Sequence, residues 1–176
     1  MKKPKGFESF PIWIVLIYNF ISLSLYAAGL YLTYLIKPWL ALVFFIYIIY
    51  IEAGIYREGC RHCYYYGKLC GAGRGKLAKI FVRKGNPKKF CEKSVSFKDF
   101  IPSMLLSVVP IVAGIYLLIK GFNWFILLLT VWPVIIWFFG NPVIYGELMC
   151  PNCKQGSICC PVSKFFMEME KKRRKK

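Results

Sequence analysis

The stretch from Ile12 to Ile36 reads IWIVLIYNFISLSLYAAGLYLTYLI and contains no charged residue. A helix rises about 1.5 Å per residue, so a helix of this length can cross the ~30 Å hydrocarbon core of a bilayer. A helix of a soluble bundle would need a polar face, and this stretch has almost none. The sequence therefore predicts that this helix spans a membrane.

Three further apolar stretches follow the first, at about 39–56, 101–119 and 122–140. Glu52 is the only charged residue that they contain. The whole chain of 176 residues is 57% hydrophobic and 18% aromatic, whereas soluble domains are about 45–50% apolar. These observations predict an all-α integral membrane protein with four transmembrane helices.

Short links join the predicted spans in pairs. Lys37-Pro38 joins the first two spans, and Lys120-Gly121 joins the last two. We therefore expect two transmembrane hairpins, at 11–56 and 101–140, each followed by a cysteine-rich segment, at 57–100 and 141–166. A basic amino-terminal segment, 1–10, and a basic tail, 167–176, complete the predicted organisation.

The distribution of basic residues predicts the orientation in the membrane. Of 25 Lys and Arg residues, the two hairpin tips hold one each. Three lie in the amino-terminal segment, twelve in the loop 57–98 and eight in the tail from Lys154 onward. Cytoplasmic loops of membrane proteins carry an excess of Lys and Arg. We therefore expect a protein of the cell membrane, with both termini and the long loop in the cytoplasm.

Two segments, one in each half of the chain, resemble one another. Each contains the pattern C-x2-C-x6-C, beginning at Cys60 and at Cys150. In both segments Ile-Tyr-x-Glu precedes the pattern, at Ile55 and Ile144, and Lys-x-Phe follows it. This similarity predicts an internal duplication, whose two halves would be related by an axis along the membrane normal.

All eight cysteines are expected on the cytoplasmic side of the membrane. The cytoplasm keeps thiols reduced, so thiolate metal ligands are expected in preference to structural disulfides. Two four-thiolate sites are the simplest arrangement. Cys91 would complete the first site, with His62 as a competing ligand, and Cys159 or a residue of the other segment would complete the second. The eight candidate metal ligands are Cys60, Cys63, Cys70, Cys91, Cys150, Cys153, Cys159 and Cys160.

The C-x2-C pairs suit two kinds of metal centre. Tetrahedral zinc is favoured because a structural clamp needs only closed four-fold coordination. An iron–sulfur cluster is the alternative, since proline follows the last ligand in bacterial ferredoxin runs as Pro161 follows Cys160 here. Free or redox-active thiols are a third interpretation.

The segment Arg61-His62-Cys63-Tyr64-Tyr65-Tyr66-Gly67 resembles the Arg-His-Pro-x-Tyr-x-Gly signature of the integral-membrane isoprenylcysteine and phospholipid N-methyltransferases. Cys63 stands where that family has proline. The resemblance implies an S-adenosylmethionine pocket at the cytoplasmic membrane face. By this resemblance, the pocket would be lined by Arg61, His62, Tyr65 and Gly67.

Two basic segments point to anionic lipid as a partner. The segment from Lys76 to Lys84 interleaves apolar and basic residues, which predicts a short amphipathic helix on the lipid surface. The terminal cluster 171–176 would attract lipid headgroups. Nucleic acid is disfavoured as a partner because no recognisable nucleic-acid module accompanies these basic residues.

The leading functional hypothesis is a non-catalytic membrane scaffold or adaptor, whose zinc module docks a protein partner or a second copy of the chain. The alternative is a membrane electron-transfer subunit that carries iron–sulfur clusters. An S-adenosylmethionine-dependent methyltransferase is the third hypothesis.

Overall fold

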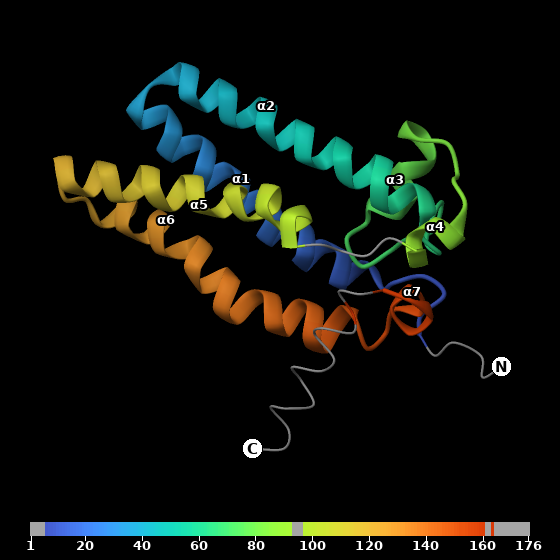
Figure 1. The fold of residues 1–176 in the computed structure, drawn as a ribbon. Coiled ribbons are helices and arrows are strands. Elements are labelled where there is room, and N and C mark those ends of the chain that lie inside the picture. The colour runs from blue at the N-terminus through green and yellow to red at the C-terminus, as the bar shows by residue number, and fades with distance from the viewer. Residues whose placement is uncertain (1–5, 93–96, 161–162, 164–176) are drawn as a thin grey trace. The chain divides into compact units, whose positions relative to one another are not determined.

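The computed structural model describes residues 6–92, 97–160 and 163, with the side chains of residues 88 and 91–100 excepted. Most of the described residues are helical and none lies in a strand, so the prediction of an all-helical protein is confirmed. The predicted tail 167–176 lies outside them. In chain order the elements are α1 (Ile12–Ile36), α2 (Pro38–Gly54), η1 (Ile55–Gly59), η2 (Cys60–His62), α3 (Arg74–Phe81), α4 (Pro87–Glu92), α5 (Phe97–Lys120), α6 (Trp124–Ile135), η3 (Ile136–Gly140), η4 (Pro142–Met149) and α7 (Lys154–Ile158) (Figure 1).

Four helical stretches in the described part of the chain are long and apolar enough to cross a membrane. They are Ile12–Ile36, Pro38–His62, Ile101–Lys120 and Trp124–Met149. This confirms the predicted number of helices that could span a membrane.

The second and fourth spans are longer than the sequence predicted. The second continues beyond residue 56 through η1 and η2, and the fourth continues beyond residue 140 through η4. Both extensions contain π-helical turns, in η1 and in η4, and η3 directly precedes the second extension. Pro142 does not end the fourth helix, because it occupies the first turn of η4, where a missing N–H is tolerated.

The chain divides into two compact units, which are described separately. The helical unit comprises Phe20–Ala53 and Ser96–Phe139, and thus most of α1, α2, α5 and α6. The cysteine unit comprises Met1–Asn19, Gly54–Val95 and Gly140–Lys176. The cysteine unit therefore contains both C-x2-C-x6-C segments and the ends of the helices that lead into them.

Small residues bring the helices of the helical unit together. Gly29 of α1 lies against Phe44 of α2 and Pro110 of α5, and Gly114 of α5 lies against Thr130 of α6. A Cβ atom at either glycine would collide with these neighbours. Close approach at small residues is how helices associate in lipid, where no hydrophobic force acts between them.

Polar side chains in the helical unit are tied to partners on other helices. Tyr26 Oη donates to Glu52 Oε1 at 2.7 Å, which gives the one acidic residue of the predicted spans a hydrogen-bond donor. Trp132 Nε1 donates to Ser24 Oγ at 3.0 Å. In hydrocarbon no water can serve these groups, so partners within the bundle are required.

Candidate thiolate site

Each C-x2-C pair begins where a membrane-spanning helix ends in a π-helical turn. The N–H of Cys60 donates to the carbonyl of Ile55, and the N–H of Cys150 donates to the carbonyl of Tyr145 at 2.9 Å. Both bonds reach back five residues, as in a π-helix. Such turns are rare in proteins, and those that occur are frequently found at functional sites. The two segments therefore enter their first cysteine through the same backbone geometry.

The cysteines of each pair bracket one tight turn. Cys63 N–H donates to the carbonyl of Cys60 at 3.3 Å, and Cys153 N–H donates to that of Cys150 at 3.2 Å. The pairs thus match in backbone hydrogen bonding as well as in sequence. Two sulfur atoms from one turn are typical of thiolate metal sites.

Backbone N–H groups are directed at sulfur atoms in both segments. The N–H of Tyr65 donates to Cys63 Sγ, and the N–H groups of Gln155 and Gly156 donate to Cys153 Sγ. The third cysteine of the first segment also accepts a bond, from Gly75 N–H at 3.2 Å from its sulfur. Such donors lower the pKa of a cysteine because they stabilise the thiolate.

Two buried side chains join the segments to one another. Gln155 is 5% exposed, and its Oε1 accepts from the N–H of Tyr64 at 2.8 Å. Tyr65 is 1% exposed, and its Oη accepts from the N–H of Lys154 at 3.1 Å. The first segment is therefore packed directly against the second.

The amino-terminal segment closes the other side of the cysteine unit. Tyr65 Oη donates to the carbonyl of Phe7 at 2.7 Å, and Phe7 N–H donates to the carbonyl of Asn152 at 2.9 Å. Glu8 forms ion pairs with Lys68 and Lys154, one from each segment. This segment was predicted only as a basic end, and its phenylalanines were the signal that it could also pack.

Burial raises the pKa of the thiols at the centre of the unit. The pKa of Cys63 is raised to about 12, mainly by desolvation, and the nearby thiols of Cys70, Cys153 and Cys60 raise it further. The N–H bond from Tyr65 opposes this rise. A thiolate at Cys63 therefore interacts with a cysteine of the other segment, Cys153, as well as with its own segment.

The second segment behaves in the same way. Desolvation and the nearby Cys160 and Cys153 raise the pKa of Cys150 to about 12, while the hydroxyl of Ser163 donates to its sulfur and lowers it. Desolvation and Cys160 also raise the pKa of Cys153, as does Cys70 of the first segment. The six cysteines of the two patterns thus form one electrostatically connected group.

The structure distinguishes Cys159 from this group. All six cysteines of the patterns carry free thiols. Cys159 is disulfide-bonded and receives a hydrogen bond from Gln155 Nε2 at 3.3 Å, whereas its neighbour Cys160 is free. The side chain of Cys91 lies outside the described residues.

The described residues contain no group of three or more His, Cys, Asp or Glu side chains that converge as a metal site. His62 Nδ1 lies 2.9 Å from the carbonyl oxygen of Asn86, so this nitrogen carries the proton and donates. The candidate site is therefore a group of neighbouring thiols, and His62 is held at its edge by a backbone carbonyl.

Residues of the methyltransferase-like signature serve the packing of the unit. Tyr65 is its buried centre, as described above. Gly67 adopts a left-handed φ of 78°, which favours glycine, and its N–H donates to the carbonyl of Gly75 at 2.8 Å. The carbonyl of Arg61 accepts from Gly85 N–H at 2.9 Å.

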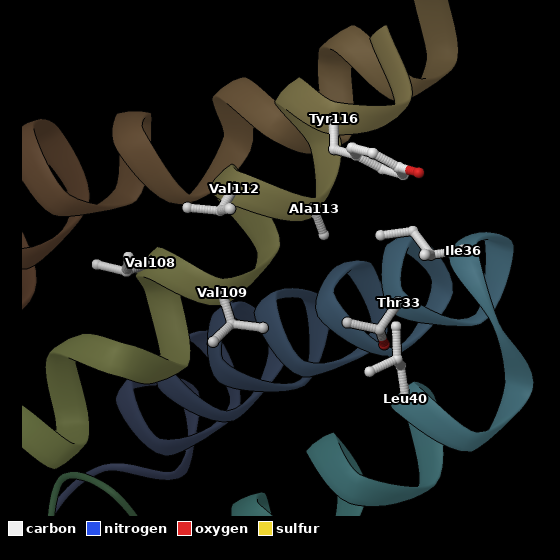
Figure 2. Close-up of a pocket in the computed structure, with 8 residues that line it drawn as sticks. All are labelled: Thr33, Ile36, Leu40, Val108, Val109, Val112, Ala113 and Tyr116. Carbon is white, nitrogen blue, oxygen red and sulfur yellow. The ribbon is translucent and has the colours of Figure 1, made fainter. Parts of the chain in front are cut away.

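A second feature is an apolar cavity of about 480 Å³ in the helical unit. It lies between α5 and the linked ends of α1 and α2 (Figure 2). The hydroxyl of Thr33 donates to the carbonyl of Gly29 at 2.7 Å, so this polar group of the lining is already engaged. The lining residues are Thr33, Ile36, Leu40, Val108, Val109, Val112, Ala113 and Tyr116.

Comparison of this chain with protein-family models, curated proteins and solved structures finds no match.

Proposed function

We propose that this chain is a multi-pass protein of the cell membrane whose two cysteine segments bind zinc as one shared thiolate site. The proposed ligands are the six cysteines of the two patterns. The observation that carries the proposal is that Gln155 and Tyr65 hold the two segments against one another, so that the free thiols of both patterns lie in one unit. The six ligands are Cys60, Cys63, Cys70, Cys150, Cys153 and Cys160.

A divalent cation would offset the free-energy cost of burying several thiolates close together. Burial disfavours the thiolate form of Cys63 and neighbouring thiols add repulsion, so that its pKa is raised to about 12. Zinc replaces the protons and neutralises that repulsion. The backbone donors at Cys63 and Cys153 are of the kind that orient and tune thiolate ligands in metal sites.

The small core of the cysteine unit supports the same proposal. Its buried residues are few, and loops make up much of it. Metal binding adds stabilising free energy to a fold whose ligands come from separate segments. A zinc site that joins both segments would supply that stability.

The number of ligands constrains the number of ions. Two tetrahedral zinc ions have eight coordination positions between them, and six thiolates fill these only if two thiolates bridge both ions. Cys63 and Cys153 are the proposed bridging ligands, since each interacts with cysteines of both segments. We therefore propose two zinc ions per chain in one shared cluster.

The membrane arrangement proposed from the sequence is retained. The two hairpins would place both segments on the cytoplasmic side, where basic residues are concentrated. An internal duplication is supported by the matching π-helical entry, the matching C-x2-C turn and the matching N–H···S bonds at Cys63 and Cys153. The function proposed for this unit is a non-catalytic platform that docks a protein partner.

Metal analysis of anaerobically purified protein in detergent tests the site. Two zinc ions per chain and no visible absorbance are expected. The variant C60S/C63S/C70S should lose all zinc if the site is shared, and half of it if the sites are separate. The variant C159S, which removes a disulfide-bonded cysteine outside the group, should keep both ions.

Iron with acid-labile sulfide would replace the zinc proposal with electron transfer. The platform function is tested by crosslinking in native membranes. Complexes with a defined partner should form with the wild type and C159S and should be absent with C60S/C63S/C70S. Equal crosslinking of all three chains would contradict a platform that depends on the metal.

A further inference from the structure

Helix α3 exposes three large apolar side chains on one face. Leu77 is 47% exposed, Ile80 is 76% exposed and Phe81 is 69% exposed. Residues spaced by three and four lie on the same side of a helix. The opposite side, at Gly75 and Ala78, is buried in the cysteine unit. The helix is thus anchored by its small residues, and its apolar face is uncovered.

Basic residues border this apolar face. Lys76 and Ile80 are four residues apart, which places them about 40° from one another around the helix. Arg83 and Lys84 follow directly after the helix, and all three basic side chains are exposed. In the described part of the chain, none of the three forms an ion pair. This surface therefore combines an apolar face with positive charges that no acidic side chain of the described residues neutralises.

Contacts within the cysteine unit place α3 against the ends of two membrane-spanning helices. The ring centroids of Phe81 and Tyr56 are 5.7 Å apart, and Tyr56 belongs to the span Pro38–His62. Arg74 Nη1 donates to Tyr18 Oη at 3.1 Å, and Tyr18 belongs to the span Ile12–Ile36. The ends of such spans lie at the headgroup level of a bilayer, where aromatic residues are enriched.

We propose that α3, together with Arg83 and Lys84, is an interfacial helix that docks onto the anionic lipid surface of the bilayer that the spans cross. The apolar face formed by Leu77, Ile80 and Phe81 enters the boundary between headgroups and acyl chains. Lys76, Arg83 and Lys84 bind the anionic headgroups. A helix with an apolar face bordered by basic residues binds anionic interfaces in this way. This inference does not depend on zinc binding.

Hydrogen–deuterium exchange on the full chain in lipid nanodiscs tests the proposal. One set of nanodiscs contains phosphatidylcholine alone, and the other contains phosphatidylcholine with phosphatidylserine. Amides of residues 76–84 should exchange at least about fivefold more slowly with phosphatidylserine, since each basic residue near an anionic surface contributes attraction. High salt should remove this difference.

Two variants with the same loss of charge separate a local effect from a general one. K76Q/K84Q should lose the protection that phosphatidylserine gives, whereas K37Q/K120Q should keep it. Equal exchange in both lipids would overturn the proposal. Protection that depends on the number of chains per disc, and not on lipid charge, would assign the face to a second copy and also overturn it. Zinc content measured on the same samples keeps this outcome distinct from that of the thiolate site.

Discussion

Different interactions stabilise the helical unit and the cysteine unit internally. In the helical unit, glycines such as Gly29 and Gly114 allow helices to pack closely, and polar side chains are few and paired. In the cysteine unit, buried polar groups of Tyr65 and Gln155 join segments that are about ninety residues apart. The comparison teaches that close packing at small residues holds the apolar helices together, whereas hydrogen bonds between distant segments hold the cysteine unit together.

Removal of zinc should produce the largest difference in stability between the two units. Structural zinc contributes on the order of 10–16 kcal/mol to small metal-dependent folds. A strong chelator is therefore expected to release the amide protection of Tyr65 and Gln155 while the far-ultraviolet circular dichroism of the spans persists. Hydrogen–deuterium exchange and circular dichroism of the same sample provide the measurement. Unchanged protection of both residues after complete zinc loss would contradict a metal-dependent unit.

Zinc affinity should depend on pH, and this dependence concerns the cysteine unit alone. Because the pKa of Cys63 and of Cys150 is raised to about 12, zinc must displace protons at neutral pH. Zinc affinity should therefore rise with pH, by up to about tenfold per pH unit for each proton displaced. Competition titrations between pH 6 and pH 8 measure this, and a pH-independent affinity would contradict it.

The same raised pKa values predict that the zinc-free cysteine unit becomes less stable as the pH rises above neutral. A thiol whose pKa is higher in the folded than in the unfolded state stabilises the fold below the unfolded pKa of about 8.5. That contribution is lost as the pH rises from there to about 12. The zinc-free cysteine unit should thus unfold more readily at pH 10 than at pH 7, as followed by exchange of its amides. The helical unit serves as the internal control.

Truncation of Tyr65 should have the next largest effect. Tyr65→Ala removes a buried ring at the centre of the cysteine unit and is expected to cost about 3–5 kcal/mol. Tyr65→Phe keeps the ring but leaves the carbonyl of Phe7 and the N–H of Lys154 without this partner, at about 1–3 kcal/mol. Thermal unfolding with saturating zinc measures both. Tyr50→Phe, at a site that is 70% exposed in the helical unit, is the matched control and should be close to neutral.

Substitution of Gly114 should affect the helical unit and spare the cysteine unit. A side chain at this position would collide with Thr130, so Gly114→Leu is expected to destabilise the bundle by about 1–3 kcal/mol through overpacking. Gly121→Leu is the matched control, because no atom lies within 4 Å of a Cβ there. Zinc content should stay the same in both variants. Equal thermal stability of the two glycine variants would contradict packing control by Gly114.

The ends of the spans show where sequence patterns are informative and where they fail. The stretch from Ile12 to Ile36 was predicted to the residue, because uncharged length is a direct consequence of bilayer thickness. The fourth span was predicted to stop near Gly140, yet it continues to Met149. Asn141-Pro142 looks like a helix end in sequence, but π-helical turns on both sides accommodate the proline.

The cysteine patterns were only partly sufficient to identify the candidate site. The repeated C-x2-C-x6-C spacing named six residues whose thiols are free in the structure, and their role as metal ligands stays a prediction. The sequence included both Cys159 and Cys160 among the candidate ligands and left open which of the two adjacent thiols would serve the site; in the structure Cys159 is disulfide-bonded and Cys160 is free. Gln155 was missed, since a glutamine in a loop carries no signal of burial before its partners are known.

The sequence by itself determined four apolar helices and two matching cysteine patterns, because hydrophobic length and ligand spacing are local properties of the chain. Tertiary structure alone decided that both patterns occupy one unit, and that Tyr65 and Gln155 join them. It also decided that α3 leaves its apolar face exposed beside Tyr56. The reason is physical: hydrogen bonds between residues far apart in the chain, and the burial that they produce, depend on the packing of whole segments and leave no periodic trace in the sequence.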